Sequence, residues 1–233
     1  MGRKRKPSVG RRILGYALKA LFVLLAFTIL QVVLLRFINP PFTTMTLWEW
    51  IKKGELVTDH RLYNSWRPLK EISPNIRKAV LAGEDQRFLS HHGFDFTEMN
   101  QAVKDMVLKK GYRGASTITM QAARTVFLWP GRTWFRKMAE AYYAVLIEIF
   151  WGKERILEIY LNTVDWGKDL LGVEAASKRY FHRSSSSISA SQAALMVAIL
   201  PNPHRWSPIH PNPQVLGRQK RILRDMKKMP LVP

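Results

Sequence analysis

An apolar run near the N-terminus restricts the folds open to this chain more than any other feature. The run, ILGYALKALFVLLAFTILQVVLL, occupies residues 13–35, with Lys19 near its start and Gln31 as a polar interruption. A membrane span needs about 20 mostly apolar residues, so the run is long enough to cross a bilayer as a helix. A cleavable signal peptide has a shorter apolar region and a small-residue cleavage site. We therefore expect a retained transmembrane helix at residues 13–36.

The charges before this run predict its orientation. Residues 1–12 carry six Lys or Arg and no acidic residue, and such basic flanks stay in the cytoplasm. The predicted organisation is therefore a basic cytoplasmic tail (1–12), the membrane helix (13–36), a linker and membrane-proximal segment (37–70), and a domain outside the cytoplasm (71–233).

Composition limits the partners and the chemistry. The formal net charge is +20, and there is no cysteine. The charge favours acidic partners such as phospholipid or a polyanionic substrate, and the lack of cysteine excludes a disulfide scaffold and a thiol nucleophile. Because most of the chain is expected outside the cytoplasm, no nucleic acid is expected as a partner.

Helical signals dominate the region after residue 70, and no series of strands and hairpins is evident. Ser73 is predicted to cap a helix that begins at Pro74 and ends near Gly83. Asp95 is predicted to cap a second helix that Gly111 ends. The remaining pattern predicts helices over 133–152, 153–162 and 189–200 (with a Ser189–Gln192 capping box), a small loop at 184–187, and one more helix before the end.

Two carboxylates and two histidines follow the first of these helices, in the stretch EDQRFLSHHGFD (84–95). Glu84 is expected at the carbonyl end of the helix, where the negative pole disfavours a carboxylate, and apolar neighbours would disfavour it further. Both effects raise the pKa of a Glu toward the value that a general base needs near neutrality. The alternative is an ordinary surface pair of Glu84 and Asp85. His91 and His92 are expected to fix the loop, because no second cluster has metal-ligand spacing.

Two further stretches place hydroxyl groups and cations at predicted helix starts. In RGASTITMQAAR (113–124), Ser116 and Thr117 can add donors to the free N–H groups of a helix start, which bind anions well. The alternative is a plain capped helix. In GRTWFRKMAE (131–140), Arg136 and Glu140 are four residues apart and share a helix face. The alternative there is a solvated surface ion pair.

Large apolar side chains surround these charges. An exposed patch of this kind just after a membrane anchor predicts a surface that dips into the bilayer interface. Its members are Phe127, Leu128, Trp129, Trp134 and Phe135.

Five stretches follow one another in the order EDQRFLSHHGFD, GASTITMQ, RKMAE, KERILEIYLN and AALMVAILPNP. In this order they resemble the five motifs of the peptidoglycan glycosyltransferases, glycosyltransferase family 51, from about residue 70 to about residue 205. The resemblance implies a mostly α, lysozyme-like helical domain with a hydrophobic membrane-associated jaw, preceded by one transmembrane helix. Only one helix is expected after these motifs, so a monofunctional biosynthetic transglycosylase without a transpeptidase domain is expected.

The resemblance also implies a reaction and its residues. The family polymerises lipid II into β-1,4 glycan with inversion and releases undecaprenyl pyrophosphate. Glu84 matches the general base, and Glu140 matches a second essential glutamate. Met120 departs from the pattern, because many members have Gln there. The positions that match substrate-binding residues are Asp85, Phe88, His91, Ser116, Thr117, Gln121, Arg124, Arg132, Arg136 and Lys137.

Several expectations about partners follow. No cofactor is certain; Mg²⁺ or Mn²⁺ is a candidate because a pyrophosphate attracts divalent cations, although no all-protein metal site is visible. The expected partners are lipid II, the growing glycan chain and the membrane, with cell-wall synthesis or division proteins as candidates. The expected location is the bacterial inner membrane, single-pass. Arg218 and Arg224, in the last helix, are expected to be surface residues away from the donor site.

Two rival functions remain open at this stage. A lytic, lysozyme-like glycosidase would also use a glutamate at a helix end, but it would not need the Arg/Lys cluster. A non-catalytic, basic, membrane-anchored module would tolerate replacement of Glu84.

The charge distribution around the apolar run yields a prediction for topology. A reporter enzyme fused after the C-terminus should be active only on the outer side of the membrane, because the six basic residues before the span retain the N-terminus in the cytoplasm. Parallel fusions of a periplasm-active and a cytoplasm-active reporter measure this directly. A cytoplasmic signal from the C-terminal fusion would reverse the predicted orientation.

Overall fold

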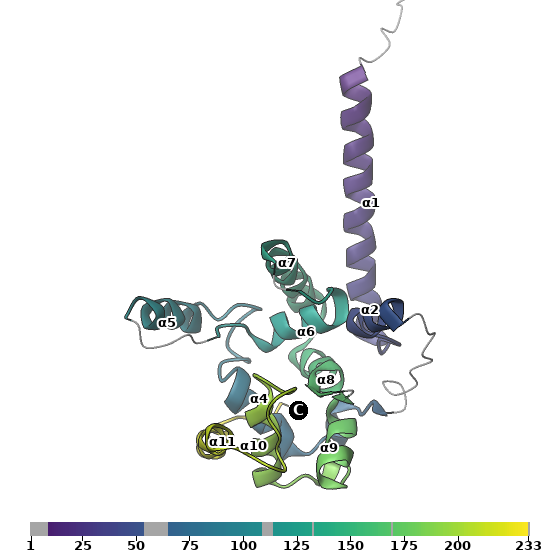
Figure 1. Cartoon of the computed structure of the whole chain (residues 1–233). Coiled ribbons are helices and arrows are strands. Elements are labelled where there is room, and N and C mark those ends of the chain that lie inside the picture. The colour runs from purple at the N-terminus through teal and green to yellow at the C-terminus, as the bar shows by residue number, and fades with distance from the viewer. Residues whose placement is uncertain (1–8, 54–64, 109–113, 132, 169, 233) are drawn as a thin grey trace, which may run out of the picture. The chain divides into compact units, whose positions relative to one another are not determined.

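The computed structural model describes residues 9–53, 65–108, 114–131, 133–168 and 170–232, and it is mostly helical (Figure 1). It contains two compact units, residues 1–38 and 39–233. In the first unit, α1 (Val9–Phe37) has 29 residues and a mean hydropathy of 2.5 over its most apolar window. A helix of that length is about 43 Å long, more than the roughly 30 Å of a bilayer's hydrocarbon core. The helix is therefore compatible with a single-pass membrane anchor.

The second unit is built almost entirely from helices. Its elements in chain order are α2 (Thr44–Lys53), η1 (Leu69–Glu71), α4 (Pro74–Glu84), α5 (Phe96–Val107), α6 (Ile118–Phe127), α7 (Trp134–Phe150), α8 (Lys153–Thr163), β1 (Asp165–Gly167), β2 (Leu170–Leu171), α9 (Val173–Phe181), η2 (Ser185–Ser187), α10 (Ala190–Ile199) and α11 (Pro213–Met226).

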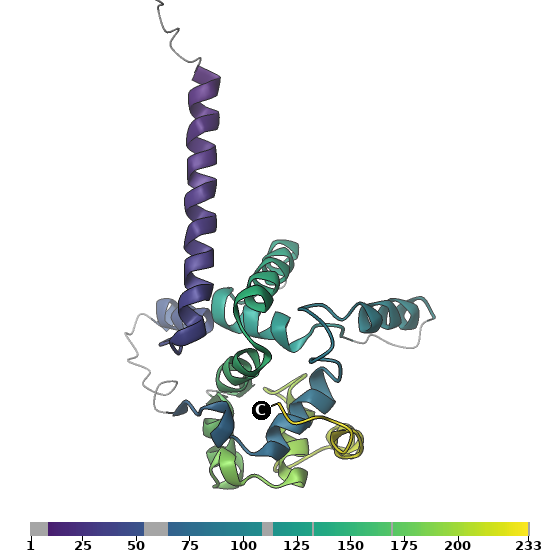
Figure 2. The ribbon, with the colours of Figure 1, turned by 180° about the vertical axis from the view of Figure 1, so that it is seen from behind.

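The helices of this unit pack in two groups. Helices α4, α10 and α11 pack on one another, and α6 packs on α7 and α8 (Figures 1 and 2). Helix α8 also contacts η1 and α9. The large buried side chains include Phe88 after α4, Tyr160 on α8 and Trp166 on β1. The groups meet where α4 ends and α6 begins, which is where the predicted site residues lie.

The first helix of the domain ends near Gly83, as expected, but the glycine lies inside the helix and does not break it. Helix α4 begins after the predicted cap, Ser73, and continues through Gly83 to Glu84. A Cβ atom at position 83 would lie 2.5 Å from Cγ1 of Val197 on α10 and 3.2 Å from Cδ1 of Ile222 on α11. The glycine therefore allows close packing of three helices instead of breaking one.

The other helix predictions have mixed outcomes. Side-chain caps at Asp95 and Ser189, the latter in a full capping box, are confirmed, and the helix expected from residue 133 is capped by Thr133. Helix α5 ends at Val107, before the predicted stop at Gly111, which lies outside the described residues.

Several elements of the second unit were not predicted from the sequence. The predicted linker contains α2, which packs on α6 and whose Thr44 hydroxyl donates to the Leu128 carbonyl (2.5 Å). No series of strands and hairpins was expected, and the only sheet among the described residues is the short antiparallel pair of β1 and β2, with Asp165 opposite Leu171 and Gly167 opposite Leu170. Helix α9 follows them, and the serine loop forms the 3-10 turn η2.

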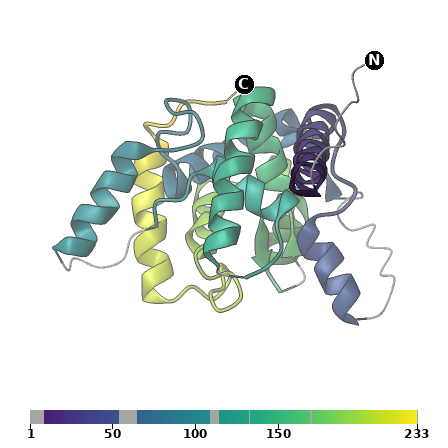
Figure 3. The same ribbon diagram turned by 90° about the horizontal axis from the view of Figure 1, so that it is seen from above.

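Helix α5 extends away from the rest of its unit (Figures 1 and 3). It has no buried residue, although its sequence is amphipathic. Its exposed apolar residues are Phe96, Met99, Val103, Met106 and Val107.

A buried carboxylate on α9 connects this helix to the serine turn. Glu174 is 1 % exposed and accepts hydrogen bonds from the Ser185 N–H (2.8 Å) and hydroxyl (2.7 Å). Its other oxygen faces Arg67 (3.2 Å) and Lys178 (3.1 Å). Burial alone would raise the pKa of Glu174, but the Ser185 hydrogen bonds and the two cations outweigh it and lower the pKa from 4.5 to about 2.

This lowered pKa predicts the acid sensitivity of the fold. A carboxylate with a depressed pKa stabilises the folded state above its unfolded pKa, and the contribution disappears as the pH falls through the folded pKa. Glu174→Gln should therefore lower the free energy of unfolding by roughly 3 kcal/mol at pH 7. The difference from wild type should shrink as the pH falls from 4.5 toward 2. Urea unfolding at several pH values measures this, with the exposed Glu154→Gln as control; an equal loss at every pH would contradict the prediction.

Candidate active site

Glu84 is the last residue of α4, and its carboxylate contacts helices from both packing groups. The amide of Gln121 on α6 donates to Glu84 Oε2 (3.0 Å), and Nη2 of Arg218 on α11 lies 3.5 Å from Glu84 Oε1. The Tyr160 hydroxyl on α8 donates to the amide oxygen of Gln121 (3.3 Å). Because that oxygen is occupied, the NH₂ group of Gln121 points at the carboxylate.

The environment of Glu84 raises its pKa, as the sequence predicted. Burial is the largest cause, and the charge of Asp85 adds to it. The hydrogen bond from Gln121 and the charges of Arg218 and Arg124 act in the opposite direction. The side chain keeps 14 % of its surface exposed, so a substrate hydroxyl can reach it. A carboxylate with a raised pKa and an open edge is suited to accept a proton near neutral pH.

Asp85, the next residue, has only internal partners. Its carboxylate accepts from His91 Nε2 (3.0 Å to each oxygen) and from the backbone N–H of Ile118 (3.0 Å). Asp85 is the C-cap residue of α4, and Ile118 is the first residue of α6. The buried carboxylate therefore fastens the end of α4, the following loop and the start of α6 together.

The loop after Asp85 is fixed by buried contacts, as expected for His91. Phe88 is 1 % exposed and packs edge-on against the His91 ring. Nζ of Lys153 lies 4.5 Å from the Phe88 ring centre and donates to the His91 carbonyl (2.7 Å). Gly93 has a φ of 88°, in the region that favours glycine, and its carbonyl accepts from the Thr117 hydroxyl (2.6 Å).

A second carboxylate lies on α7 between two cations. Glu140 is 2 % exposed, and its oxygens pair with Nη1 of Arg136 and with Nζ of Lys137 (2.9 Å). Lys137 Nζ also donates to the Ser116 hydroxyl, just before α6 (3.0 Å). Nε of Arg136 is buried and has no hydrogen-bond partner within the described residues. The predicted pairing of Arg136 with Glu140 is confirmed, and it is buried instead of solvated.

The start of α6 connects the two carboxylates. Ser116 contacts the Lys137–Glu140 pair, Ile118 is held by Asp85, and Gln121, one turn later, contacts Glu84. Thr117 caps the helix by accepting from the Met120 N–H (3.2 Å). Figure 1 shows α6 between α4 and α7. The arrangement places a proton acceptor and a group of cations at one helix start.

The exposed apolar patch is smaller than predicted. Trp134 and Phe135 are 85 % and 79 % exposed, and Trp129 is also exposed. Leu128 is buried, however, and Phe127 stacks on Tyr143 with a centroid distance of 4.4 Å. The Phe127 side chain therefore packs between α6 and α7.

Three further residues of the motif stretches differ in their surroundings. Arg124 is exposed on α6 and contributes to the electrostatics of Glu84. Arg132 lies outside the described residues. Met120, at the position that departs from the family pattern, is buried.

Sequence reasoning was wrong about Arg218 and gave no role to two other residues. Arg218 is not a free surface residue, because it pairs with Glu84 across helices that are far apart in sequence. Glu148 on α7 accepts from the Thr119 hydroxyl (2.6 Å) and from Lys153 (2.8 Å). Tyr160, within the stretch KERILEIYLN, orients Gln121. Only the packing of α11 and α8 brings Arg218 and Tyr160 to the site; no local pattern signals it.

The described residues do not fit a divalent cation held by the protein. They contain no group of three or more His, Asp or Glu side chains that could hold one. Glu140 already faces two cations, and Asp85 is occupied by His91 and a backbone N–H. We therefore derive no step through Mg²⁺ or Mn²⁺.

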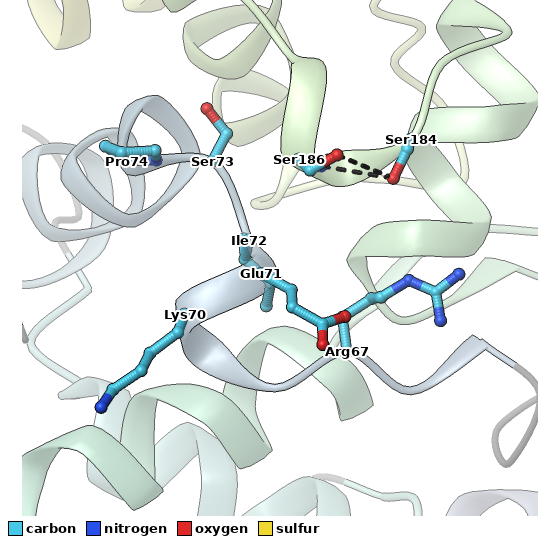
Figure 4. A pocket seen from close by; sticks show the side chains of 8 residues that line it. All are labelled: Arg67, Lys70, Glu71, Ile72, Ser73, Pro74, Ser184 and Ser186. Atoms are coloured by element: carbon cyan, nitrogen blue, oxygen red, sulfur yellow. Dashed lines mark hydrogen bonds between the residues drawn. The ribbon is translucent and has the colours of Figure 1, made fainter.

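A surface pocket of about 320 Å³ lies elsewhere, at the opposite end of α4 (Figure 4). Its lining includes Arg67, Ser73 and Pro74, with Ser184 and Ser186 hydrogen-bonded to each other across one side. The first and last residues of α4 are about 15 Å apart along the helix. None of the predicted site residues lines this pocket.

Comparisons with known proteins show the family of the chain. A family model described as "Transglycosylase" matches residues 53–227. A protein of Bdellovibrio bacteriovorus is 44 % identical over 211 residues, covering 89 % of this chain and 83 % of its own. A protein of Caulobacter vibrioides is 43 % identical, covering 91 % and 90 %. One of Bacteroides thetaiotaomicron is 40 % identical, covering 98 % and 92 %. Each of the three relatives is named a biosynthetic peptidoglycan transglycosylase.

Proposed function

The chain belongs to the transglycosylase family and is a peptidoglycan glycosyltransferase of cell-wall synthesis, and we propose that it polymerises lipid II with Glu84 as the general base. The observation that carries this assignment is the position of Glu84. Its carboxylate has a raised pKa and an open edge, and it shares a helix start with a group of cations. The substrates are lipid II and the growing glycan chain, and the products are a lengthened β-1,4 glycan and undecaprenyl pyrophosphate.

The acceptor half of the reaction centres on Glu84. Its carboxylate takes the proton from the 4-hydroxyl of the acceptor sugar while that oxygen forms a bond to C1 of the donor sugar. Gln121 aims the carboxylate, and Tyr160 fixes the orientation of the Gln121 amide. Attack from the face opposite the leaving group inverts the configuration at C1.

The donor half centres on the leaving group. The bond from C1 to the pyrophosphate oxygen breaks, and the pyrophosphate leaves with the electron pair and a growing negative charge. Arg124, Arg136, Lys137 and the Ser116 hydroxyl bind that charge, because preformed donors stabilise a charge that develops in the transition state. Arg132 is assigned to the same group of cations because of its place in the motif. Glu140 holds Arg136 and Lys137 in position through its two ion pairs.

Four buried residues of the predicted set act as positioning residues. Asp85, Phe88, His91 and Thr117 are each less than 8 % exposed, and their partners are inside the protein. They fix the loop and the start of α6, so that Glu84 and the cations keep their geometry.

The apolar surfaces support a membrane-associated jaw. Trp129, Trp134 and Phe135 are exposed near the cations, and α5 carries an exposed apolar face with no buried residue. A lipid-linked substrate brings its pyrophosphate to the membrane surface, so an active site beside apolar side chains suits it. The basic N-terminal residues support an orientation in which the catalytic unit lies outside the cytoplasm.

The geometry favours this function over a lytic glycosidase. A glycosidase leaving group is a sugar hydroxyl, which needs a proton and not a group of cations. The cations around Glu140 have a clear role only when the leaving group is anionic. Incubation with lipid II and, separately, with finished peptidoglycan distinguishes the two activities.

Replacement of the base tests the assignment. Glu84→Gln keeps the size of the side chain and removes its basicity, so polymerisation of lipid II should fall by about 10²–10⁴-fold. Gel analysis of glycan products from labelled lipid II measures the loss, and circular dichroism checks the fold. Glu154→Gln on α8, which is exposed, is the matched control. Near wild-type turnover in Glu84→Gln would refute the base assignment.

The cation group yields a separate prediction. Arg124→Ala should lower kcat/KM for lipid II by about ten- to a hundredfold, because a charge-assisted contact to the leaving group contributes roughly 1.5–3 kcal/mol. Binding of a phosphoglycolipid inhibitor, measured by fluorescence anisotropy, should weaken in parallel. Arg224→Ala is the control, because Arg224 is exposed and pairs with Asp225. Equal behaviour of the two variants would show that Arg124 acts only through general attraction of anions.

A further inference from the structure

Arg218 reaches from the last helix to the candidate base. Its Nε donates to the Ala198 carbonyl on α10 (3.1 Å), and its Nη2 lies 3.5 Å from Glu84 Oε1. Helix α11 packs on both α10 and α4 (Figure 1). This packing allows the Arg218 side chain to contact Ala198 on one helix and Glu84 on the other. Arg218 lies outside the five motif stretches, so its contact depends on the fold and not on the motif pattern.

The contact with Ala198 fixes the direction of the guanidinium. Ala198 is one of the last residues of α10, and the last four carbonyls of a helix have no partner within it. Nε of Arg218 satisfies one of these carbonyls. Because the guanidinium is planar, a fixed Nε also fixes the two terminal nitrogens, one of which faces Glu84. The side chains of Arg218 and Glu84 are 26 % and 14 % exposed, so neither member of this ion pair is freely solvated.

The carboxylate of Glu84 is therefore held from two sides. Gln121 donates to Oε2 from α6, and Arg218 faces Oε1 from α11. Each carboxylate oxygen has two lone pairs, so both oxygens retain an acceptor site for the substrate proton. Two contacts on different helices restrict the rotation of the carboxylate more than either contact alone.

We propose that Arg218 is a positioning residue that holds Glu84 ionised and aimed at the acceptor hydroxyl. This rests on the proposed role of Glu84 as the general base. Arg218 itself does not contact the reacting atoms; it acts through the carboxylate that does.

The effect of Arg218 on the pKa of Glu84 is set against the other charged groups around that carboxylate. Asp85 at the end of α4 raises the pKa of Glu84, and Arg124 on α6 and Arg218 on α11 lower it, against the larger effect of burial. Burial raises the pKa of Tyr160 on α8 well above 10, so its phenol stays neutral. Helix α10, which also packs on α4, carries no charged residue. Of the two cations, Arg218 lowers the pKa of Glu84 more than Arg124 does.

The state of Arg218 does not complicate the test. Burial is the largest influence on its pKa and lowers it, and the charge of Glu84 raises it. A guanidinium stays protonated throughout the pH range of an enzyme assay. A change in the pH profile of an Arg218 variant therefore reports on Glu84.

The experiment compares pH profiles of kcat/KM for lipid II in the full-length enzyme. In Arg218→Gln the lost cation should move the acidic limb to higher pH. Activity on the acidic side should fall by about threefold to tenfold, and the loss should diminish on the alkaline side. Arg218→Lys keeps the charge and should restore the limb toward its wild-type position. Arg224→Gln, which removes one exposed charge from the same helix, should leave the profile unchanged.

The outcomes separate this proposal from the base assignment. If Glu84→Gln retains turnover, the base assignment fails, and this proposal fails with it. If Glu84→Gln is inactive but Arg218→Gln loses activity equally at every pH, only the positioning role of Arg218 is overturned. Arg218→Met keeps the apolar stem and gives a second folded variant for the same profile. Failure of both neutral variants to fold would assign Arg218 to stability and likewise overturn the proposal.

Discussion

The buried carboxylate of Asp85 is the contact on which the geometry of the site depends. It accepts hydrogen bonds from His91 and from the N–H of Ile118, and so joins the end of α4, the following loop and the start of α6. A buried donor left without a partner costs about 1–3 kcal/mol, so these contacts strongly favour one arrangement of the three segments. Glu84 precedes Asp85 directly, and Gln121 lies one turn beyond Ile118. Their mutual contact follows from the arrangement that Asp85 imposes.

The two glutamates of the site have opposite electrostatic surroundings. Glu140 is buried between Arg136 and Lys137, both on its own helix, so its negative charge is balanced locally. Glu84 faces one cation at 3.5 Å and one neutral amide, and burial raises its pKa. Both oxygens of Glu140 are engaged by close cations, whereas Glu84 keeps an open edge at which a substrate hydroxyl can bind. This difference supports different roles for the two residues within one reaction.

Sequence reasoning succeeded where the signal was local. The caps at Ser73, Asp95 and Ser189 were predicted correctly, because a cap and its helix are adjacent in sequence. The raised pKa of Glu84 was also predicted, from its place at a helix end and from its apolar neighbours, and burial is its largest cause. The packing role of Gly83 and the contact of Arg218 with Glu84 were not predicted, because both depend on α4 packing against α10 and α11, which lie more than a hundred residues later in the chain. No local pattern reports which helices will pack together, so such contacts required the structure.

The start of α6 gives the two halves of the proposed reaction a common support. Ser116 contacts Lys137, one of the cations proposed to bind the leaving group, and Gln121 contacts the carboxylate proposed to take the acceptor proton. Both residues belong to one short segment whose backbone is held by Asp85. A displacement of this segment would therefore move the base and the cations together. Bond formation at the acceptor oxygen and bond breaking at the pyrophosphate oxygen need simultaneous alignment, and a shared helix start preserves that alignment better than two independent loops would.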